Sequence, residues 1–365
     1  DVIIAGGGIA GSYLASRIGR NHRVLVIERN KAIVPKDSGI VSTNFDQIIG
    51  KKAKSLVKHE ITSMECVSPA GKTFCLKSDK PYAYILHREK FLGVLRKMAS
   101  KSADIVFDSV SGIEHHPDYV SVKTSTSTYE TKLLVGCDGA NSVVRKSIGI
   151  ENPRLALGIM VRTKQKLEGN ISVFFNKYFS PDFFSWIIPQ NNEYGMMTAI
   201  RPADYFNYFV RDMCLPPGKM YAYMIPFTYT KSFGHRTLLV GDACGQNKPL
   251  TGGGIMFSLT GAGHAARMIN DALDAKRFDS TFLSYYEKYW KKDLAWEIEK
   301  QFMMRMVYRK LTNKEVDEMF GNFGPFFSTL ATFNYDKLSE SWGHFPKLRF
   351  AKFLLTKMPR VVSQI

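Results

Sequence analysis

Three glycines near the N-terminus have the spacing that lets a protein backbone hold a pyrophosphate. Gly6, Gly8 and Gly11 form the pattern GxGxxG within "DVIIAGGGIAGSYLASRIGRNHRVLVIERN". The first glycine permits a tight turn, the second lets backbone approach the phosphates, and the third lets a helix pack on a strand. Glu28 follows about 20 residues later, where an acid binds the ribose hydroxyls of an adenosine. Together these residues predict the binding of a dinucleotide.

A second glycine cluster lies far along the chain, in "GDACGQNKPLTGGGIMFSL" from Gly241 to Leu259. Asp242 supplies a charged hydrogen-bond acceptor there, and the glycines at 252–254 open a helical pattern. A helix N-terminus stabilises negative charge, and glycine lets backbone lie against a flat ring without a Cβ clash. This segment predicts close contact between backbone and a flat or charged ligand.

The elements that must position these residues follow the pattern of an α/β nucleotide-binding domain. Apolar periodicity predicts a strand over 1–5, a helix over 12–20 and a second strand over 23–27. Arg88 stands at the start of an amphipathic helix, and Asp138 stands in a turn that follows a buried strand. Each polar motif is therefore predicted to lie where a strand, a turn and a helix meet.

In this order, GxGxxG, the Arg-headed helix, the Asp-Gly turn and "GD…P…GGG" resemble the para-hydroxybenzoate hydroxylase-like flavoproteins over roughly residues 1–270. The resemblance implies that the cofactor is FAD, that Asp242 binds its ribityl chain, and that the glycine-rich helix start faces the flavin. The cofactor-binding residues that it implies are Gly6, Gly8, Gly11, Glu28, Ser38, Gly39, Arg88, Val110, Asp138, Asp242, Gly252, Gly253, Gly254 and Ile255. No second GxGxxG is present for a nicotinamide cofactor.

A closer resemblance is to the geranylgeranyl reductase family, chiefly its archaeal members, which saturate the isoprenoid chains of lipids. It is carried by "GDACGQNKPLTGGGI", by "FFSWIIP" and by the tail "FLSYYEKYWKKDLAWEIEKQF", so it extends over nearly the whole chain. It implies an FAD-dependent oxidoreductase that acts on C=C bonds, with Phe184, Trp186 and Pro189 at the substrate.

One position departs from that family. Relatives often carry a cysteine near the flavin where this chain has Ser38, in "PKDSGIVS". A serine hydroxyl is far less acidic than a thiol, whose pKa is about 8.5. The sequence shows no partner that would activate Ser38, so we expect Ser38→Ala to leave most activity intact. Ser38 is a weak catalytic candidate, and the sequence names no proton donor.

The expected fold is mixed α/β, with a discontinuous FAD-binding domain over 1–50, 81–150 and 236–275. An inserted antiparallel sheet over 51–80 and 151–235 forms the substrate domain, because stretches such as "NISVFFNKYF" alternate apolar and polar residues. Residues 276–365 form a C-terminal helical region. The many aromatic residues of the sheet domain suit either an ordinary core or a long apolar tunnel for a polyprenyl chain.

Charge and composition limit the partners. Lys and Arg number 50 against 33 Asp and Glu, a net charge of +17, which suits either an acidic partner or a generally basic protein. No nucleic-acid motif is present. The tail carries Lys347, Arg349, Lys352, Lys357 and Arg360 among apolar residues, as in a helix at a membrane surface or one packed on the protein.

The five cysteines form no CxxC pair and no zinc spacing, which predicts reduced thiols, a cytosolic setting and no bound metal. The expected partners are a polyprenyl lipid and an electron donor that is either a ferredoxin-like protein or a reduced nicotinamide.

Two other functions stay open. "FSWIIP" is similar to the WxWxIP element of flavin-dependent halogenases, although Phe184 replaces the first Trp, so a monooxygenase or halogenase is one alternative. A non-catalytic lipid-binding flavoprotein is the other. A monooxygenase would consume oxygen with its substrate, a reductase would need an anaerobic reductant, and a binding protein would turn over nothing.

Overall fold

The computed structural model describes residues 1–34, 37–328, 334–338 and 346–357. The chain divides into two compact units. The first consists of Asp1–Pro35, His87–Leu155 and Ile225–Glu299, and the second of Lys36–Leu86, Ala156–Met224 and Lys300–Ile365. The helical region that we expected over 276–365 is shared between the two units, because helix α7 (Ser280–Lys310) contributes residues to both.

A six-stranded sheet forms the centre of the first unit. Across the sheet its strands are β18 (Phe233–Gly234), β19 (Thr237–Leu239), β12 (Leu133–Gly136), β1 (Val2–Ala5), β2 (Val24–Glu28) and β8 (Asp104–Phe107). All neighbouring pairs are parallel except β18 and β19. Strands β1 and β12 are buried along their whole length, as strands of a parallel sheet covered on both faces must be.

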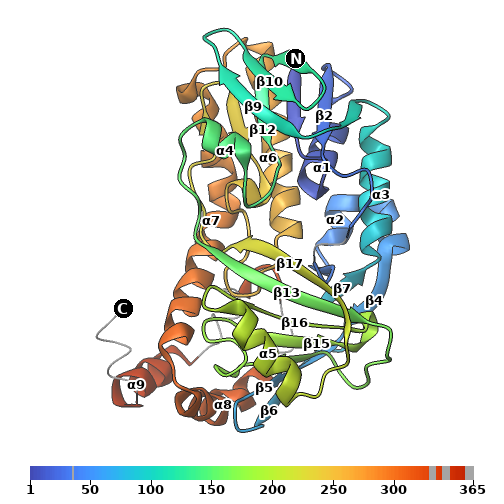
Figure 1. Cartoon of the computed structure of the whole chain (residues 1–365). Coiled ribbons are helices and arrows are strands. Elements are labelled where there is room, and N and C mark those ends of the chain that lie inside the picture. Colours follow the sequence, from blue (N-terminus) through green and yellow to red (C-terminus); the bar gives the residue numbers. More distant parts are fainter. Residues whose placement is uncertain (35–36, 329–333, 339–345, 358–365) are drawn as a thin grey trace. The chain divides into compact units, whose positions relative to one another are not determined.

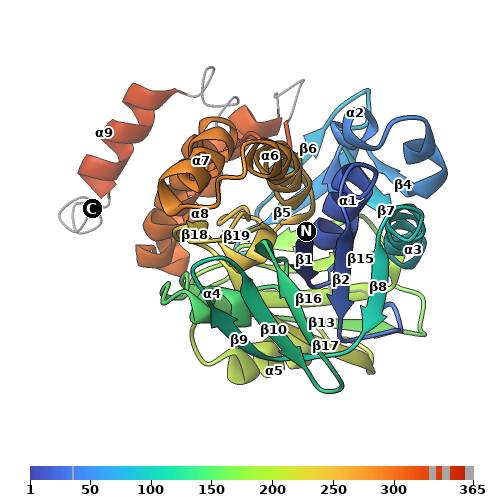
Figure 2. The same cartoon turned by 90° about the horizontal axis from the view of Figure 1, so that it is seen from above.

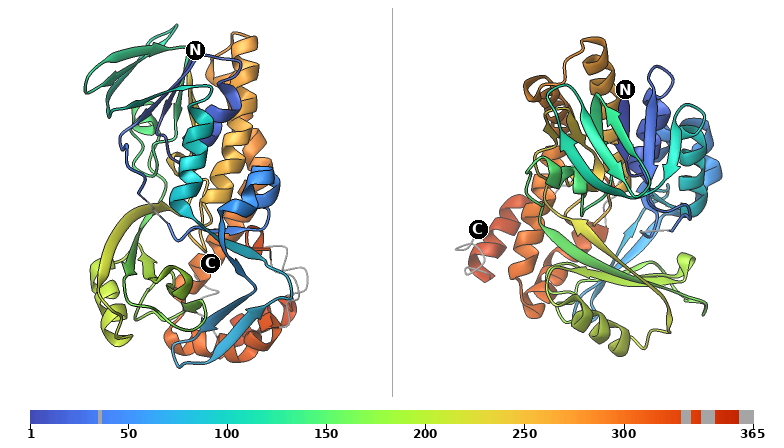
Figure 3. Two further views of the ribbon diagram at one scale, coloured as in Figure 1. Left: turned by 90° about the vertical axis from the view of Figure 1, so that its right-hand side faces the viewer. Right: turned by 45° about the horizontal axis from the view of Figure 1, so that its top comes forward.

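Helices cover one face of this sheet and a small sheet covers the other (Figure 2 and Figure 3). The helices are α1 (Ile9–Ile18), α3 (Arg88–Ala99) and α6 (Ile255–Asp274), and α1 contacts both of the others. The small sheet comprises β9 (Val110–His115), β10 (Val120–Thr124) and β11 (Thr128–Thr131).

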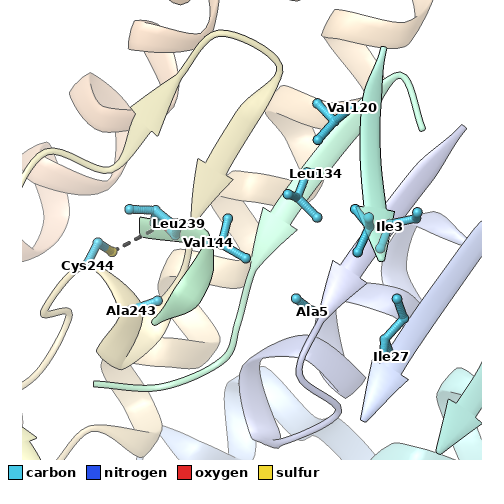
Figure 4. Close-up of a cluster of buried hydrophobic side chains, with 10 residues drawn as sticks. Ile3, Ala5, Ile27, Val120, Leu134, Val144, Leu239, Ala243 and Cys244 are labelled. Atoms are coloured by element: carbon cyan, nitrogen blue, oxygen red, sulfur yellow. Dashed lines mark hydrogen bonds between the residues drawn. The ribbon is translucent and has the colours of Figure 1, made fainter. Parts of the chain in front are cut away.

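The apolar core between these two sheets extends to the turns that carry Asp138 and Asp242. Figure 4 shows Ile3, Ala5 and Leu134 of the large sheet beside Val120 of β10. Val144 of the short helix α4 (Val143–Ser147) and the loop residues Ala243 and Cys244 complete the cluster. The turns that carry Asp138 and Asp242 are therefore continuous with the buried core.

A seven-stranded sheet forms the centre of the second unit. Its order is β17 (Gly218–Pro226), β13 (Leu155–Thr163), β16 (Glu193–Thr198), β15 (Ser185–Ile188), β14 (Ser172–Phe174), β5 (Ser63–Val67) and β6 (Thr73–Lys77). The sheet is largely antiparallel, as expected, but β14 and β5, which come from distant parts of the chain, pair in parallel. Helix α5 (Pro202–Asp212) packs on β16 through Phe206 and Phe209 (Figure 1).

A smaller sheet and several further helices complete the described part of the second unit. The sheet joins β3 (Ile40–Ser42), β7 (Ala83–Leu86) and β4 (Val57–Ile61), beside α2 (Phe45–Ile49) and a short 3₁₀ helix over Gly50–Leu56. Helix α8 (Asn313–Ser328) contacts β6. Phe353 of α9 (Lys347–Lys357) belongs to one buried apolar cluster with Phe323 of α8 and Leu76 of β6.

A buried ion pair ties the end of α7 to the seven-stranded sheet. Arg305 Nη2 lies 2.9 Å from Asp182 Oδ2, and both side chains are 2% exposed. Asp182 also accepts a hydrogen bond from the Thr198 hydroxyl. Burial lowers the pKa of the Arg305 guanidinium, so its charge depends on that carboxylate.

We expect Asp182→Ala to lower the free energy of unfolding by about 3–5 kcal/mol, because it leaves a buried guanidinium without its counter-charge. Asp212→Ala is the matched control, since Asp212 pairs with Arg211 at the surface, and it should change little. Urea unfolding followed by fluorescence measures both variants. Equal effects of the two substitutions would show that the buried ion pair contributes no more to the free energy of unfolding than the surface pair does.

Candidate cofactor and catalytic site

The N-terminal turn has the geometry that its glycines predict. A Cβ on Gly6 would lie 2.4 Å from the Cys137 carbonyl oxygen, and one on Gly11 would lie 1.9 Å from the Gly6 carbonyl oxygen. Gly6 also has φ +103°, a region that side chains disfavour. Gly8 caps α1, and a Cβ there would meet no atom within 4 Å. Two of the glycines are therefore needed for packing, and the third leaves open space at a helix N-terminus.

Glu28 lies at this turn, as expected. Its two carboxylate oxygens accept hydrogen bonds from the backbone N–H groups of Gly7 and Asn30, each at 2.7 Å. Arg96 of α3 lies 3.6 Å from the same carboxylate and donates to the carbonyl oxygen of Gly7 at 3.1 Å. A carboxylate oxygen accepts more than one hydrogen bond, so Glu28 can hold the turn and still bind a ribose hydroxyl.

Sequence reasoning missed Arg96. Arg96 lies in α3 and its partner Glu28 in β2, so only the fold brings the two together. Arg88, which we expected to bind the cofactor, is the first residue of α3 and is buried.

Asp138 is divided between two tasks. Its Oδ2 accepts from the backbone N–H groups of Val143 and Val144 at 2.7 and 3.2 Å, which caps α4. Its Oδ1 is buried and has no hydrogen-bond partner among the described residues. Burial raises the pKa of this carboxyl. The Oδ2 oxygen of Asp138 therefore holds the start of α4, and the Oδ1 oxygen can accept a hydrogen bond from a hydroxyl of a bound cofactor.

The loop that carries Asp242 is built on buried polar side chains. The Gly241 N–H donates to Gln246 Oε1 at 2.8 Å, and Gln246 Nε2 bonds the Tyr286 hydroxyl at 3.0 Å. That hydroxyl donates to the Leu239 carbonyl oxygen at 2.9 Å. Gln246 is fully buried, so this chain of bonds determines the path of the loop after β19.

The glycines of this loop are required by its own packing. A Cβ on Gly253 would lie 2.8 Å from Lys248 Cε, and one on Gly254 would lie 2.9 Å from Asn247 Nδ2. Lys248 and Asn247 are both buried. The same Asn247 nitrogen donates to Asp242 Oδ1 at 3.2 Å, which aims the carboxylate toward the start of α6.

Gly252 has φ +68°, and Ile255 is the first residue of α6. No side chain caps this helix in the described part of the chain, so its first N–H groups suit a negatively charged ring edge.

Arg145 connects the Asp138 turn to the Asp242 loop, and the sequence did not reveal it. Its guanidinium is fully buried and donates to the carbonyl oxygens of Ala243 at 2.7 Å and Ala140 at 2.8 Å. A basic residue in a short polar-looking segment usually indicates a surface helix, so only the packing identifies it.

The remaining predicted residues are placed as follows. Val110 begins β9 and packs at the edge of the core cluster.

Ser38 and Gly39 belong to the second unit, whereas the other predicted cofactor residues belong to the first. Ser38 donates a hydrogen bond to Glu193, so it has the partner that the sequence did not show. Our expectation for Ser38→Ala rested on the absence of such a partner, and that premise was wrong.

The predicted substrate residues lie together in the second unit. The rings of Phe184 and Trp186 meet edge to face with centroids 6.2 Å apart. Trp186 lies across Gly195, where a Cβ would be 2.6 Å from its ring, and its Nε1 is buried with no hydrogen-bond partner among the described residues. Pro189 follows the last residue of strand β15 and begins a 3₁₀ helix. The group presents flat apolar surface and one unused donor.

Comparison with known proteins identifies the cofactor. The family described as an FAD binding domain matches residues 53–216. The chain is 27% identical to digeranylgeranylglycerophospholipid reductase 2 of Methanothermobacter thermautotrophicus, over 87% of this chain and 90% of that protein. It is 23% identical to digeranylgeranylglycerophospholipid reductase of Methanocaldococcus jannaschii, over 100% of this chain and 96% of that protein.

Solved structures show the same fold. A geranylgeranyl bacteriochlorophyll reductase-like protein of Thermoplasma acidophilum superposes with a TM-score of 0.83 at 19% identity, covering 100% of this chain and 98% of that one. A p-nitrophenol 4-monooxygenase of Pseudomonas putida has a TM-score of 0.69 at 17% identity, with coverages of 95% and 97%. The predicted fold class, the FAD cofactor and the assignment as a flavin oxidoreductase are confirmed.

We expect Gly8→Ala and Gly11→Ala to separate cofactor binding from folding. At Gly8 a methyl group meets no protein atom, so the apoprotein should keep its stability within about 0.5 kcal/mol, while FAD binds at least about tenfold more weakly. At Gly11 the methyl group overlaps a carbonyl oxygen, so stability itself should fall by about 1–3 kcal/mol. Thermal unfolding of apoprotein and titration with FAD measure the two effects, and unchanged FAD binding in Gly8→Ala would contradict the phosphate-binding role.

We also expect Asp242→Ala to weaken FAD binding by about ten- to hundredfold, because a hydrogen bond to a charged group contributes about 1.5–3 kcal/mol. Asp242→Asn keeps one oxygen acceptor and should lose less. Asp271→Ala removes an exposed acid from the same helix region and serves as the control. FAD affinity is read from the change in flavin fluorescence on binding, and parental affinity in Asp242→Ala would place the flavin elsewhere.

Proposed function

We propose that the chain is a geranylgeranyl reductase-like flavoprotein and that it saturates C=C bonds in the isoprenoid chains of membrane lipids. Bound and reduced FAD supplies the hydride for such a saturation. The alkene is not activated by a carbonyl group, so the protein has to align it closely. The residues of the turn at Gly6–Gly11, with Glu28, would hold the adenosine half of the cofactor, and Asp242 would hold the ribityl chain.

The Asp242 loop carries this proposal. Gln246, Asn247 and Lys248 are buried inside it, and they belong to the segment through which the chain resembles geranylgeranyl reductases. Cys244 and Gly245 stand where aromatic hydroxylases of this fold usually carry a histidine. The loop is thus built as a reductase loop rather than as a hydroxylase loop.

The proposal extends to the substrate and the electron donor. The apolar rings of Phe184 and Trp186 suit a polyprenyl chain. Electrons would come from a ferredoxin-like protein or from a reduced nicotinamide. Against a halogenase activity, this chain has Phe184 in place of the first Trp of the WxWxIP element. A protein that only binds lipid would have no use for a redox cofactor.

The test is expression of the chain in a host that makes unsaturated isoprenoid lipids. Mass spectrometry should show lipids heavier by one H₂ for each saturated bond, and Gly8→Ala should reduce the yield of these lipids. Purified protein, reduced under anaerobic conditions, should also be reoxidised by the unsaturated lipid alone. Reoxidation that requires oxygen, with a hydroxylated or halogenated product, would instead establish the rival activity.

We further propose that helix α9 touches an anionic membrane surface, as befits a cytoplasmic enzyme with a lipid substrate. Phe350 and Phe353 pack against Phe323 at ring distances of 5.3 and 5.4 Å. The opposite side presents Leu348 and Leu355, which are 88% and 60% exposed, together with basic residues. Arg360, which we counted in this basic segment, lies outside the described residues. None of the described helices is long and apolar enough to cross a bilayer.

Vesicle flotation tests the membrane contact. The parent should float with vesicles that contain anionic lipid and should be released by high salt. Substitution of both Leu348 and Leu355 by Ser should abolish flotation, while Met220→Ser, at another exposed apolar side chain, should not. Flotation of the double variant at the parental level would exclude α9 as the contact.

A further inference from the structure

We propose that the exposed ring of Phe107, held in place by Arg96, is the surface on which the adenine of FAD stacks. Phe107 is the last residue of β8 and is 45% exposed. The sequence analysis gives no role to either residue. The proposal concerns how the protein holds its cofactor, so it does not depend on which substrate the reduced cofactor acts on.

The strand order of the first unit favours an adenosine at the end of β8. Strands β1, β2 and β8 are neighbours and run parallel, with α1 and α3 in the connections between them. Such a βαβαβ arrangement is the mononucleotide-binding half of a dinucleotide-binding sheet, and its ligand lies beyond the carboxyl ends of the strands. The Gly6–Gly11 turn follows β1, Glu28 ends β2 and Phe107 ends β8. The three strand ends therefore carry groups suited to phosphate, ribose and base.

Phe107 lies beside the residue that is expected to bind the ribose. In the parallel pairing of β2 and β8, Glu28 and Phe107 are register partners. Neighbouring strands of a sheet are about 4.7–4.9 Å apart. A base attached to a ribose at Glu28 therefore reaches the Phe107 ring by extending about one strand spacing toward the edge of the sheet.

Arg96 connects the ends of the same three strands. It donates to the Gly7 carbonyl oxygen at 3.1 Å and to the Lys31 carbonyl oxygen at 3.0 Å. Its Nη2 lies 3.6 Å from Glu28 Oε2, and its guanidinium carbon lies 5.9 Å from the centre of the Phe107 ring. A guanidinium at this distance attracts an aromatic ring. Because the backbone contacts fix the guanidinium, the ring has a defined place although it is exposed.

The backbone after Phe107 is fixed as well. The Asp108 carboxylate accepts hydrogen bonds from the backbone N–H groups of Ser109 at 2.7 Å and Thr126 at 3.1 Å, and from the Thr126 hydroxyl at 2.7 Å. These bonds hold the end of β8 to the turn between β10 and β11. The adenine would therefore meet a surface that is already formed, so little ordering opposes binding.

The proposed contact distinguishes FAD from FMN. An exposed aromatic ring can stack on a base without reading its hydrogen-bonding groups, and such stacking contributes about a tenfold to hundredfold gain in affinity. FMN has no adenine, so it would gain nothing from Phe107. The ring would thus favour the dinucleotide over the mononucleotide.

A purely structural role of Phe107 is the competing interpretation. Contacts between cations and aromatic rings are frequent in proteins, and the ring would then only shield Arg96 from water. Its removal would loosen the turn at Gly7 and weaken every ligand of that turn alike. The two interpretations differ in whether the loss of affinity depends on the adenine.

The experiment measures the affinities of FAD, ADP and FMN by titration calorimetry, with the full chain freed of FAD and shown to rebind it. Phe107→Leu keeps an apolar side chain beside Arg96 but removes the flat ring, and Phe107→Tyr keeps the ring. Tyr285→Leu is the matched control, because Tyr285 of α7 is 44% exposed and has Lys288 Nζ 4.5 Å from the centre of its ring.

Phe107→Leu should bind FAD and ADP about tenfold to hundredfold more weakly, while FMN affinity stays within about threefold of the parental value. Its melting temperature without ligand should equal that of the parent, because the side chain is exposed. Phe107→Tyr and Tyr285→Leu should bind all three ligands as the parent does. Arg96→Lys keeps the positive charge but loses the forked contacts, so ADP should be weakened more than FMN.

Three results overturn the proposal. Parental ADP affinity in Phe107→Leu would show that the ring does not contact the adenine. An equal loss of ADP and FMN affinity in that variant would assign Phe107 a structural role. A parent chain that binds FMN but not ADP would have no separate adenosine site. All three would leave the reductase function standing, because the lipid analysis tests that function independently.

Discussion

There is no room for a Cβ atom between the end of β1 and the start of α1, and the geometry of the first unit depends on that constraint. Gly11 of the helix lies against the Gly6 carbonyl oxygen, and Gly6 lies against the Cys137 carbonyl oxygen. Helix α1 can therefore begin directly above the strand ends. The space left open at Gly8 and the carboxylate of Glu28 both follow from this close approach. A side chain at either packed glycine would move the helix start away from the position where its N–H groups can meet phosphate.

Buried polar groups provide the second layer of control. Gln246, Tyr286 and Arg145 are buried without exposure to water, and each bonds the backbone of a turn that carries an expected cofactor ligand. An unpaired buried polar group is costly, so these bonds hold each loop in one conformation. Asp138 and Asn247 each keep one buried oxygen without a partner among the described residues. Such atoms are what a bound cofactor with many hydroxyl and ring polar groups would satisfy.

The second unit arranges charge in a different way. Asp182 with Arg305 and Glu193 with Arg162 are both buried carboxyl–guanidinium contacts. The first has both partners enclosed and fixes α7, as a structural pair does. In the second, Arg162 is 25% exposed and the carboxyl also holds the hydroxyl of Ser38. The two contacts between the same residue types therefore differ in solvent access and in the third partner of the carboxyl, which is Thr198 in the first and Ser38 in the second.

Local motifs predicted a dinucleotide and the turns at Gly6–Gly11 and Asp242, because glycine spacing and strand-to-helix transitions are properties of short segments. The FAD cofactor and the fold class were implied by the family resemblance that the order of these motifs carries. The resemblance also predicted that Phe184 and Trp186 belong to the substrate sheet, but only Trp186 lies within strand β15. Arg96, Arg145 and Glu193 could not be found in this way, since each acts on a residue far away in the chain and looks by type like a surface charge. The partner of Ser38 is 155 positions away. Sequence alone thus determined which segments approach a nucleotide, while only the tertiary structure decided which buried charges hold them, because burial changes what a charged side chain does and burial is not a local property.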